Sequence, residues 1–246
     1  MILKDNLVYL LERQRELGRL ETIQELLESN GIDSYLMEEP GVKNLVVSFN
    51  SELDEPITVI GAHWDVFNNS QGMNDNGVAV VALIRIACIL KRINVKKRVD
   101  LVFFDREETG MLGSDTYIRN VGPENIEHAI ILDIIAYGDT IMGSFYKYYI
   151  SHNFGPELYR LSYALPSDNV IFNRYNVKNV LFTVGHNYDL TLTKDRKGSQ
   201  LVYFPSATAE FYSSFHNRVN DNKIEILDFN IARRVYKMAL SGALSE

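Results

Sequence analysis

The chain has 246 residues, of which 46% are hydrophobic, and this is enough apolar material for one sizeable core. A formal net charge of -7 at pH 7 argues against a nucleic-acid partner held through phosphate contacts. A single cysteine, Cys88, excludes a disulfide within the chain, and the charge-interrupted N-terminal segment fits neither a secretory signal nor a membrane span. We therefore expect a cytoplasmic protein with no nucleic-acid or membrane partner; its oligomeric state stays open.

The first part of the chain predicts one helix followed by strands. From about residue 5 to residue 30, apolar residues recur at spacings of three and four, which is typical of one amphipathic helix ending at Asn30-Gly31. Two short extended runs follow at 34–38 and 43–49. A nearly continuous apolar strand is predicted at 56–63, and such a strand must be covered on both faces.

The middle of the chain alternates helices and strands. A strongly apolar helix is predicted at 78–93, a buried strand at 97–105, a helix-sized segment at 112–120 and a further strand at 128–136. This order implies a largely parallel sheet with helices on both faces. The basic run at 91–98 is predicted to be a solvated surface turn that complements the helix dipole, rather than a nucleic-acid patch.

The pattern is weaker from residue 137 to residue 214. Within this stretch, 155–165 predicts a helix and 179–185 predicts a strand, with loops between them. The segment 224–240 is amphipathic and predicts a terminal helix. No linker, internal repeat or low-complexity tract divides the sequence, so we expect one domain over residues 1–246.

Acidic and imidazole side chains stand at the ends of several apolar runs. Strand ends are where side chains leave a packed sheet and converge at its rim. Imidazole and carboxylate groups suit zinc when no thiolate is offered, and two neighbouring dications need a shared anionic ligand. The motifs GAHWD, GMNDN, FFDREETG, IILDII and SSFHN supply His63, Asp75, Glu108, Asp133 and His216. The sequence therefore predicts a two-metal hydrolase, with Asp75 as the shared ligand because its Gly- and Asn-rich loop can aim it.

Two further acids adjoin these candidate ligands. Asp65 lies two residues after His63 at a strand end, so both side chains are predicted on the same side, where Asp65 holds the His63 ring or acts close to the site itself. Glu107 precedes Glu108, and successive residues of an extended chain face opposite ways. One of the pair can bind metal while the other approaches the metal-bound water.

The succession GAHWD, MNDNGVA, FFDREETGMLGS, ILDII and FHNRVNDN resembles the di-zinc aminopeptidases of metallopeptidase family M28, whose motifs occur in that order. The resemblance covers about residues 56–138 firmly and 205–240 loosely. It implies an α/β fold, a three-layer α/β/α sandwich with a mixed, largely parallel central sheet. It also implies a single metallopeptidase catalytic domain over residues 1–246 and two zinc ions per chain.

The same resemblance implies metal ligands residue by residue. Asp75 would bridge the two metals, with His63 and Asp133 completing one site, and Glu108 and His216 would serve the other. It also implies a strained, sometimes cis, peptide bond directly after Asp75.

The implied catalytic roles fall on the two supporting acids. Glu107 would be the general base on the bridging water and later protonate the leaving amine, and Asp65 would orient His63. The resemblance thus implies an aminopeptidase that cleaves N-terminal residues from a peptide or aminoacyl substrate.

The chain departs from the family pattern in two places. Asn169 stands where the family usually has a histidine, although the preceding Asp168 is still expected to face the substrate. FHNRVNDN is only similar to the family's last motif, so His216 rests on position and spacing. The remaining histidines match no motif and are expected to be structural or loop residues: His128, His152 and His186.

Three alternatives stay open. A glutaminyl cyclase shares this scaffold but works with one zinc and forms a ring. A metal-free relative would serve as a binding or scaffold protein. A di-metal carboxypeptidase or deacylase would act on a substrate with a free carboxylate, and would need a basic clamp in its pocket.

Overall fold

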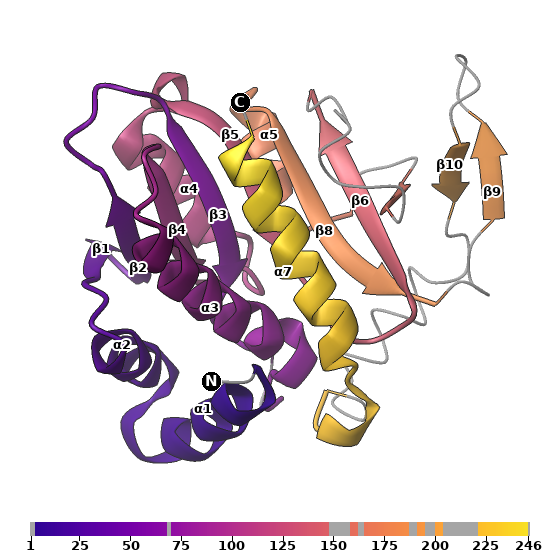
Figure 1. The fold of residues 1–246 in the computed structure, drawn as a ribbon, viewed down its shortest axis with the longest axis horizontal. Helices are drawn as coiled ribbons and strands as arrows, with labels where there is room; N and C mark the ends of the chain where they lie inside the picture. Colours follow the sequence, from indigo (N-terminus) through magenta and orange to yellow (C-terminus); the bar gives the residue numbers. More distant parts are fainter. Residues whose placement is uncertain are drawn as a thin grey trace.

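An eight-stranded sheet forms the centre of the fold (Figure 1). The computed structural model describes residues 3–67, 70–147, 158–161, 165–186, 191–194, 200–203 and 221–245, with the backbone alone at 191–194 and 200–203. The strand order is β1-β2-β4-β3-β5-β8-β6-β7. The strands are β1 Tyr35–Glu39, β2 Val42–Phe49, β3 Ile57–His63, β4 Val99–Phe104, β5 Ile126–Leu132, β6 Thr140–Tyr146, β7 Leu158–Arg160 and β8 Asn179–Gly185. A separate antiparallel pair consists of β9 Thr191–Lys194 and β10 Gln200–Tyr203.

The four central strands of the sheet are parallel. β3 pairs in parallel with β4 on one side and with β5 on the other, and β5 pairs in parallel with β8. Antiparallel pairs occur further out, where β2 joins β1 and β4, and where β6 joins β8. The sheet is therefore mixed but largely parallel, as predicted, and the carboxyl ends of β3, β4 and β5 meet at one edge.

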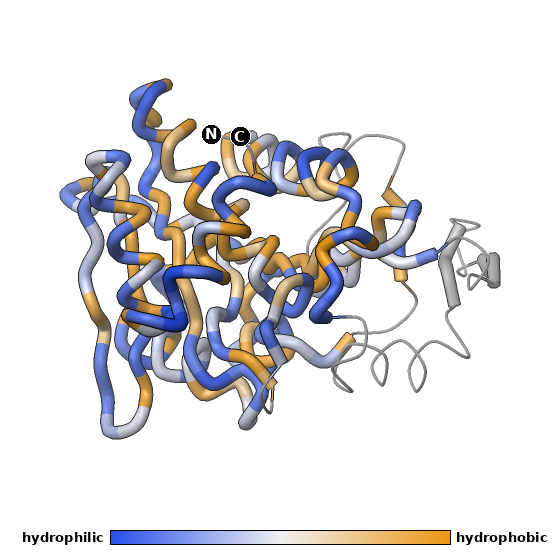
Figure 2. The backbone as a smooth tube through the Cα atoms, turned by 90° about the horizontal axis from the view of Figure 1, so that it is seen from below, coloured by the Kyte–Doolittle hydropathy of each residue, from blue (hydrophilic) through white to orange (hydrophobic). Residues whose placement is uncertain are grey.

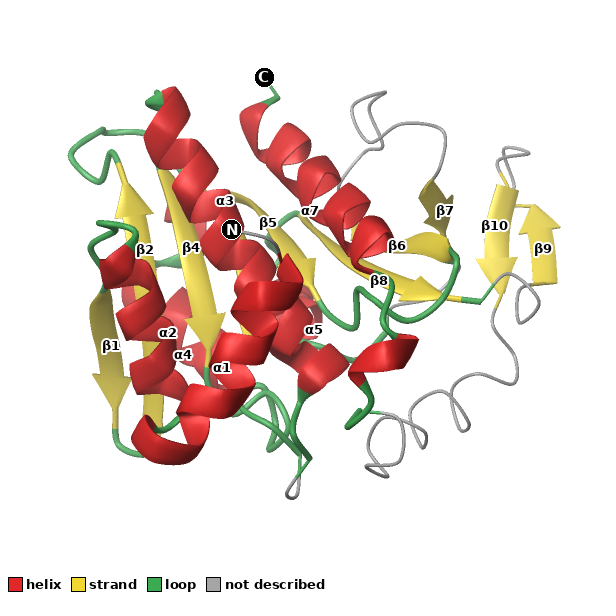
Figure 3. Cartoon of the chain, turned by 60° about the horizontal axis from the view of Figure 1, so that its bottom comes forward, coloured by secondary structure: helices red, strands yellow, loops and turns green. Residues whose placement is uncertain are grey.

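Helices cover both faces of the sheet, which gives the predicted three layers (Figures 1 and 3). α3 and α7 lie on one face with α1 and α2 packed against α3, and α4 and α5 lie on the other face. Among the described residues, no helix has both the length and the apolarity needed to cross a membrane. The helices are α1 Leu3–Leu17, α2 Arg19–Ser29, α3 Val78–Ile93, α4 Leu112–Val121, α5 Asn169–Arg174 and α7 Phe229–Leu244, with short turns η1 Met73–Gly77, η2 Pro123–Asn125 and η5 Ile224–Ile226.

Each face of the sheet has its own apolar core. The larger core joins α1, α2, α3 and α7 to one face, and the smaller core joins α4 and α5 to the other. Several helical coils change between hydrophobic and hydrophilic residues along their length, as amphipathic helices do (Figure 2). Two-sided burial explains why β3 and β4 are mostly apolar: all of their residues are buried.

The helix predicted from about residue 5 to residue 30 is two helices. α1 ends at Leu17 and α2 begins at Arg19, because Gly18 between them has φ 96°, a conformation that a glycine adopts without strain. The apolar spacing continues across the break, since both helices face the same core. The single-helix prediction was therefore wrong in its continuity, although its end at Asn30-Gly31 agrees with the end of α2.

The helix predicted at 155–165 is also wrong. Leu158–Arg160 forms the strand β7, which the sequence did not predict and which pairs in parallel with β6. The spacing of Leu158, Leu161 and Leu165 imitates a helical face, but pairing with β6 decides the conformation. At the C-terminus, the predicted helix begins at Phe229 because the Asp228 carboxylate accepts the N–H groups of Asn230 and Ile231, 2.8 and 3.3 Å away.

The packing of Gly61 against Phe104 gives a test of the core. A Cβ at Gly61 would lie 2.2 Å from Cε2 of the fully buried Phe104 ring. We expect Gly61→Ala to destabilise the protein by about 1–3 kcal/mol, because the ring is held among Tyr117 and Phe172 and cannot move freely. The free energy of unfolding, measured by urea denaturation, checks this. In a Phe104→Leu background the cost of Gly61→Ala should shrink, and an equal cost in both backgrounds would contradict the packing.

Candidate functional site

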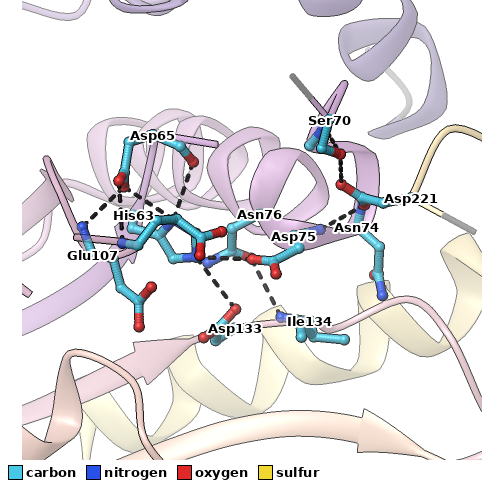
Figure 4. Close-up of polar contacts among 12 residues, drawn as sticks. His63, Asp65, Ser70, Asn74, Asp75, Asn76, Glu107, Asp133, Ile134 and Asp221 are labelled. Carbon is cyan, nitrogen blue, oxygen red and sulfur yellow. Dashed lines mark hydrogen bonds and ion pairs between the residues drawn. The ribbon is translucent and has the colours of Figure 1, made fainter. Parts of the chain in front are cut away.

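His63 is the centre of a polar cluster at the carboxyl edge of the sheet (Figure 4). It is the last residue of β3 and is 1% exposed. Its Nδ1 lies 3.2 Å from the carbonyl oxygen of Asp65 and 3.3 Å from Oδ1 of the same residue. Both neighbours of Nδ1 are acceptors, so a proton on Nδ1 has a partner there, and Nε2 is the ring nitrogen that faces the site.

Two carboxylates converge on Nε2 of His63. Asp75 Oδ1 lies 3.0 Å away and Asp133 Oδ1 lies 3.5 Å away. Asp133 directly follows β5, which pairs with β3, so strand order explains the approach. Within the described residues, neither His63 Nε2 nor Asp133 Oδ1 makes a hydrogen bond of acceptable geometry, although both atoms are buried. Buried, convergent donor atoms that the protein leaves without hydrogen bonds are what a metal ligand set requires.

Asp75 reaches the cluster from the loop before α3. The segment Met73–Gly77 has irregular backbone angles at Asp75 and Asn76, and the peptide bond between these two residues is cis, as the family resemblance implied. Asn76 joins this loop to the end of β5, because its Nδ2 donates to the carbonyl of Leu132 at 2.8 Å. The loop and the Asp133 segment are therefore tied together beside His63.

Glu107 and Glu108 enter the cluster from the segment after β4. Ligand atoms of His63, Glu107 and Glu108 lie within 4.8 Å of one another, and so do those of His63, Asp75 and Asp133. The prediction that the two glutamates alternate along an extended strand was wrong, because β4 ends at Phe104 and the pair lies in a turn. Both carboxylates of the turn approach the same imidazole.

Asp65 supports more of the site than the sequence predicted. Its Oδ1 accepts the backbone N–H of Glu107 at 3.1 Å, and its Oδ2 accepts that of Glu108 at 3.2 Å. The same carboxylate therefore contacts the His63 ring and fixes the backbone of the glutamate pair. Its pKa lies below the usual value: burial opposes ionisation, but the contact with His63 and the two N–H groups outweigh it.

Asn44 on β2 joins the two ends of the loop that carries Glu107 and Glu108. Its Oδ1 accepts the N–H of Asp105 at 3.0 Å and its Nδ2 donates to the carbonyl of Gly113 at 2.8 Å. The N–H of Gly113 also donates to the carbonyl of Asp105 at 2.8 Å. A Cβ at Gly113 would lie 2.5 Å from Asn44 Oδ1, so this close approach requires glycine. Glu107 and Glu108 thus project from a loop whose two ends are joined.

Asp168 precedes α5 and lies near enough to His63 and Asp133 for their charges to act on its carboxyl group. It is fully buried, and neither carboxylate oxygen accepts a hydrogen bond of acceptable geometry among the described residues. The nearby Ser114 hydroxyl, which favours the charged form, donates to the carbonyl of Met111. Burial raises the pKa of Asp168 to about 7, against the opposing charge of His63. Its expected orientation toward the substrate side stays a prediction.

The cluster carries more acid than one imidazole can neutralise. Burial and then Asp75 raise the pKa of Glu108 to about 8. Burial also raises the pKa of Glu107 well above its usual range; His63 opposes this rise, and Asp133 adds to it. For His63, burial lowers the pKa, but the surrounding carboxylates, Asp133 first, hold it well above its usual value. In the metal-free protein, bound protons remove part of the negative charge and so allow the carboxyl groups to lie close together. A divalent cation would replace these protons.

Two further residues near the site were not found from the sequence. The Asp221 carboxylate accepts the N–H groups of Asn74 and Asp75, and the buried Arg19 donates to carbonyls of the same loop. Asp221 lies in the FHNRVNDN motif and Arg19 in the N-terminal helical pattern, and neither context signals a contact with Asp75.

The predicted ligand His216 lies outside the described residues, as does His152. The other two histidines stay apart from both ligand groups. His128 is buried on β5 with its Nδ1 3.6 Å from Glu127 Oε2, and His186 packs edge-on against Tyr137. Of the predicted site residues, the structure brings together those on β3, the Asp75 loop, the glutamate turn and the end of β5.

Comparison with known proteins gives the family. The sequence model of the family described as peptidase family M28 matches residues 44–240. An aminopeptidase of Pseudomonas aeruginosa is 32% identical over 68 residues, which cover 28% of this chain and 13% of that protein. The match thus spans a small part of this curated relative's length.

Solved structures share the fold. The LapA aminopeptidase of Legionella pneumophila matches with a TM-score of 0.75 at 15% identity, covering 99% of this chain and 71% of that one. A glutaminyl cyclase of Bacteroides thetaiotaomicron gives 0.68 at 17% identity, covering 99% and 98%. A zinc aminopeptidase of Bacillus subtilis gives 0.62 at 18% identity, covering 82% and 49%. This chain shares the fold of these structures. The family model matches most of the chain, and this match shows that the chain belongs to peptidase family M28.

Proposed function

We propose that this chain is a zinc-dependent aminopeptidase that removes N-terminal residues from peptides, working as a single catalytic domain with two zinc ions. One observation carries the proposal: His63 is shared by two groups of buried and partly buried acids, and within each group the ligand atoms lie within 4.8 Å of one another. Membership of peptidase family M28 supports a peptidase, and the zinc aminopeptidase of Bacillus subtilis supports the choice of zinc.

The residues present fit zinc as a ligand set. Imidazole nitrogen and carboxylate oxygen are what zinc takes when thiolates are absent. In the proposal, His63 and Asp133 hold one ion, Glu108 and the predicted His216 hold the other, and Asp75 is shared. When bound, the ions supply a polarised substrate carbonyl and a water of lowered pKa.

The chain's own residues would then handle the proton. Glu107 removes a proton from the attacking water and returns it to the leaving amine. Asp65 keeps Glu107 in place through its backbone N–H and orients the His63 ring at the same time.

The charge of the site favours a substrate with a free amine. The acids around His63 include Asp168, which is fully buried and has no hydrogen bond of acceptable geometry among the described residues. A positively charged α-amino group would neutralise part of this surplus. Short peptides and aminoacyl compounds therefore suit the site better than substrates whose recognised end is a carboxylate.

A glutaminyl cyclase is the second candidate. The observation in its favour is the near-complete mutual coverage with the Bacteroides thetaiotaomicron cyclase, 99% of this chain and 98% of that one. A cyclase of this kind would use one zinc and form an amide ring at an N-terminal glutamine.

Metal content and product separate the two candidates. We expect elemental analysis to find two zinc ions per chain, and a panel of aminoacyl p-nitroanilides and short peptides to be hydrolysed. A chelator should abolish this turnover and added zinc should restore it. One zinc per chain, together with cyclisation of N-terminal glutamine and no hydrolysis, would establish the cyclase instead.

The role of Glu107 can be tested by one substitution. Glu107→Gln should leave the zinc content nearly unchanged and lower kcat by about 10²–10⁴-fold, because the proton acceptor is lost while the ligands remain. The exposed Glu124, changed to Gln, is the matched control and should leave kcat unchanged. Unchanged turnover in Glu107→Gln would remove Glu107 from this role.

The raised pKa values predict how the metal-free protein responds to pH. Folded Glu108 keeps its proton up to about pH 8, whereas an unfolded glutamate releases it near pH 4.3. The folded state therefore binds more protons in this window, and the free energy of unfolding falls as pH rises through it. His63, whose pKa is also raised, contributes with the same sign above about pH 6.5.

Thermal unfolding in the presence of a chelator checks this expectation. Tm should decrease from about pH 5 to about pH 8, and the difference in Tm between zinc-loaded and metal-free protein should widen, because zinc competes best where protons leave. A Tm of the metal-free protein that rises over this range would contradict the assignment of the acids to one buried cluster.

A further inference from the structure

The loop that presents Asp75 is held by a carboxylate from a distant part of the chain. Asp221 Oδ1 accepts the backbone N–H of Asn74 at 2.7 Å and that of Asp75 at 3.0 Å (Figure 4). Its Oδ2 accepts the hydroxyl of Ser70, which in turn accepts the N–H of Gly72 at 3.0 Å. One side chain therefore fixes the direction of the backbone immediately before the Asp75 carboxylate.

Arg19 holds the same loop through its carbonyl groups. Its Nη1 donates to the carbonyl of Gln71 and its Nη2 to that of Gly72, both at 3.0 Å. The packing is close: a Cβ at Gly72 would lie 2.9 Å from Nη1, and one at Gly77 would lie 3.2 Å from Nη2. The glycines at both ends of the loop thus let a guanidinium lie directly beneath the backbone.

Arg19 and Asp221 also balance each other in charge. Arg19 is 8% exposed and Asp221 is 1% exposed, so neither charge is solvated by bulk water. Burial lowers the pKa of Arg19 to about 10, and Asp221, followed by Asp65 and Asp75, opposes this, so Arg19 stays a cation at neutral pH. Charged partners make the stronger class of hydrogen bond, which suits a loop that must not move.

We propose that Asp221 and Arg19 are positioning residues for Asp75, Asp221 through the N–H groups of its loop and Arg19 through the carbonyls. They hold the carboxylate 3.0 Å from His63 Nε2 before any metal arrives. The inference rests on the proposed function, because it gives Asp75 the role of the shared zinc ligand. It adds two residues that touch neither metal nor substrate and act only through the backbone.

Asp221→Ala is the decisive variant, and Asp100→Ala is its matched control. Asp100 is also a buried carboxylate that accepts two side-chain hydrogen bonds, from Ser48 and Tyr117, but it lies at the start of β4, away from the site. Zinc affinity is measured by titration against a competing chelator, with Tm, kcat and KM for an aminoacyl p-nitroanilide measured on the same samples. Both variants should lose thermal stability.

The expected result separates positioning from general support of the fold. Asp221→Ala should bind zinc about 10–100-fold more weakly and lose kcat with little change in KM, while Asp100→Ala keeps wild-type zinc affinity. Asp221→Asn keeps the oxygen that accepts both N–H groups and should recover most of the affinity. Zinc binding by Asp221→Ala as tight as that of Asp100→Ala would overturn the role of Asp221.

Arg19→Lys is the second test of the proposal. It keeps a cation at the buried position and is a more conservative change than Asp221→Ala. A single ammonium cannot reproduce the fork that reaches two carbonyls, so weaker zinc binding at near wild-type Tm is expected. Wild-type affinity in Arg19→Lys would remove Arg19 from the proposal. Failure of the proposed function would look different: the wild-type protein itself would bind fewer than two zinc ions or hydrolyse none of the substrates.

Discussion

Mutual repulsion among buried and partly buried carboxylates around one imidazole is the constraint on which this site depends. His63 and Asp133 sit at neighbouring strand ends, and Asp75, Glu107 and Glu108 are brought to them by loops. Like charges in a poorly solvated place disfavour ionisation, which is why the pKa of Glu108 rises to about 8. Protons or a divalent cation must occupy the cluster, so the stability of the fold and the proposed chemistry depend on the same few atoms.

The protein holds these acids through backbone contacts more than through side-chain contacts. Asn44 joins the ends of the glutamate loop, Asn76 joins the Asp75 loop to the end of β5, and Asp221 fixes the N–H groups before Asp75. Each is a short polar residue that is buried and whose side chain hydrogen-bonds to a segment distant in the sequence. Such contacts reduce the freedom of irregular loops, and the two asparagines do so without adding a charge to the site.

The hydrophobic pattern of the sequence predicted those helices and strands that depend on local sequence alone. The parallel centre of the sheet followed from nearly continuous apolar runs such as that ending at His63, since a strand buried on both faces favours apolar residues at most positions. The break at Gly18 was missed because apolar spacing continues across it. β7 was missed because the spacing of Leu158 and Leu161 suits a helix, and only pairing with β6 decides otherwise.

The candidate site was predictable to a similar extent and for a similar reason. His63 ends a predicted strand, and Asp133 lies in the strand predicted at 128–136, which ends at Leu132 in the structure. The predicted parallel sheet was enough to expect both side chains at one edge. Asp221 and Arg19 could not be found, because their partners are backbone groups of a loop whose course no sequence pattern specifies. The turn that carries Glu107 and Glu108 was likewise not predicted, since an extended strand and a turn can begin with the same residues.

Asp65 couples two halves of the site that the sequence separates by about forty positions. Its carboxylate touches the ring of His63 and the N–H groups of Glu107 and Glu108. A shift of this one side chain would rotate His63, the proposed metal ligand, and at the same time displace Glu107, the proposed proton acceptor. Substitutions at Asp65 and at either partner should therefore combine non-additively, with the second change costing less than it does in the intact protein.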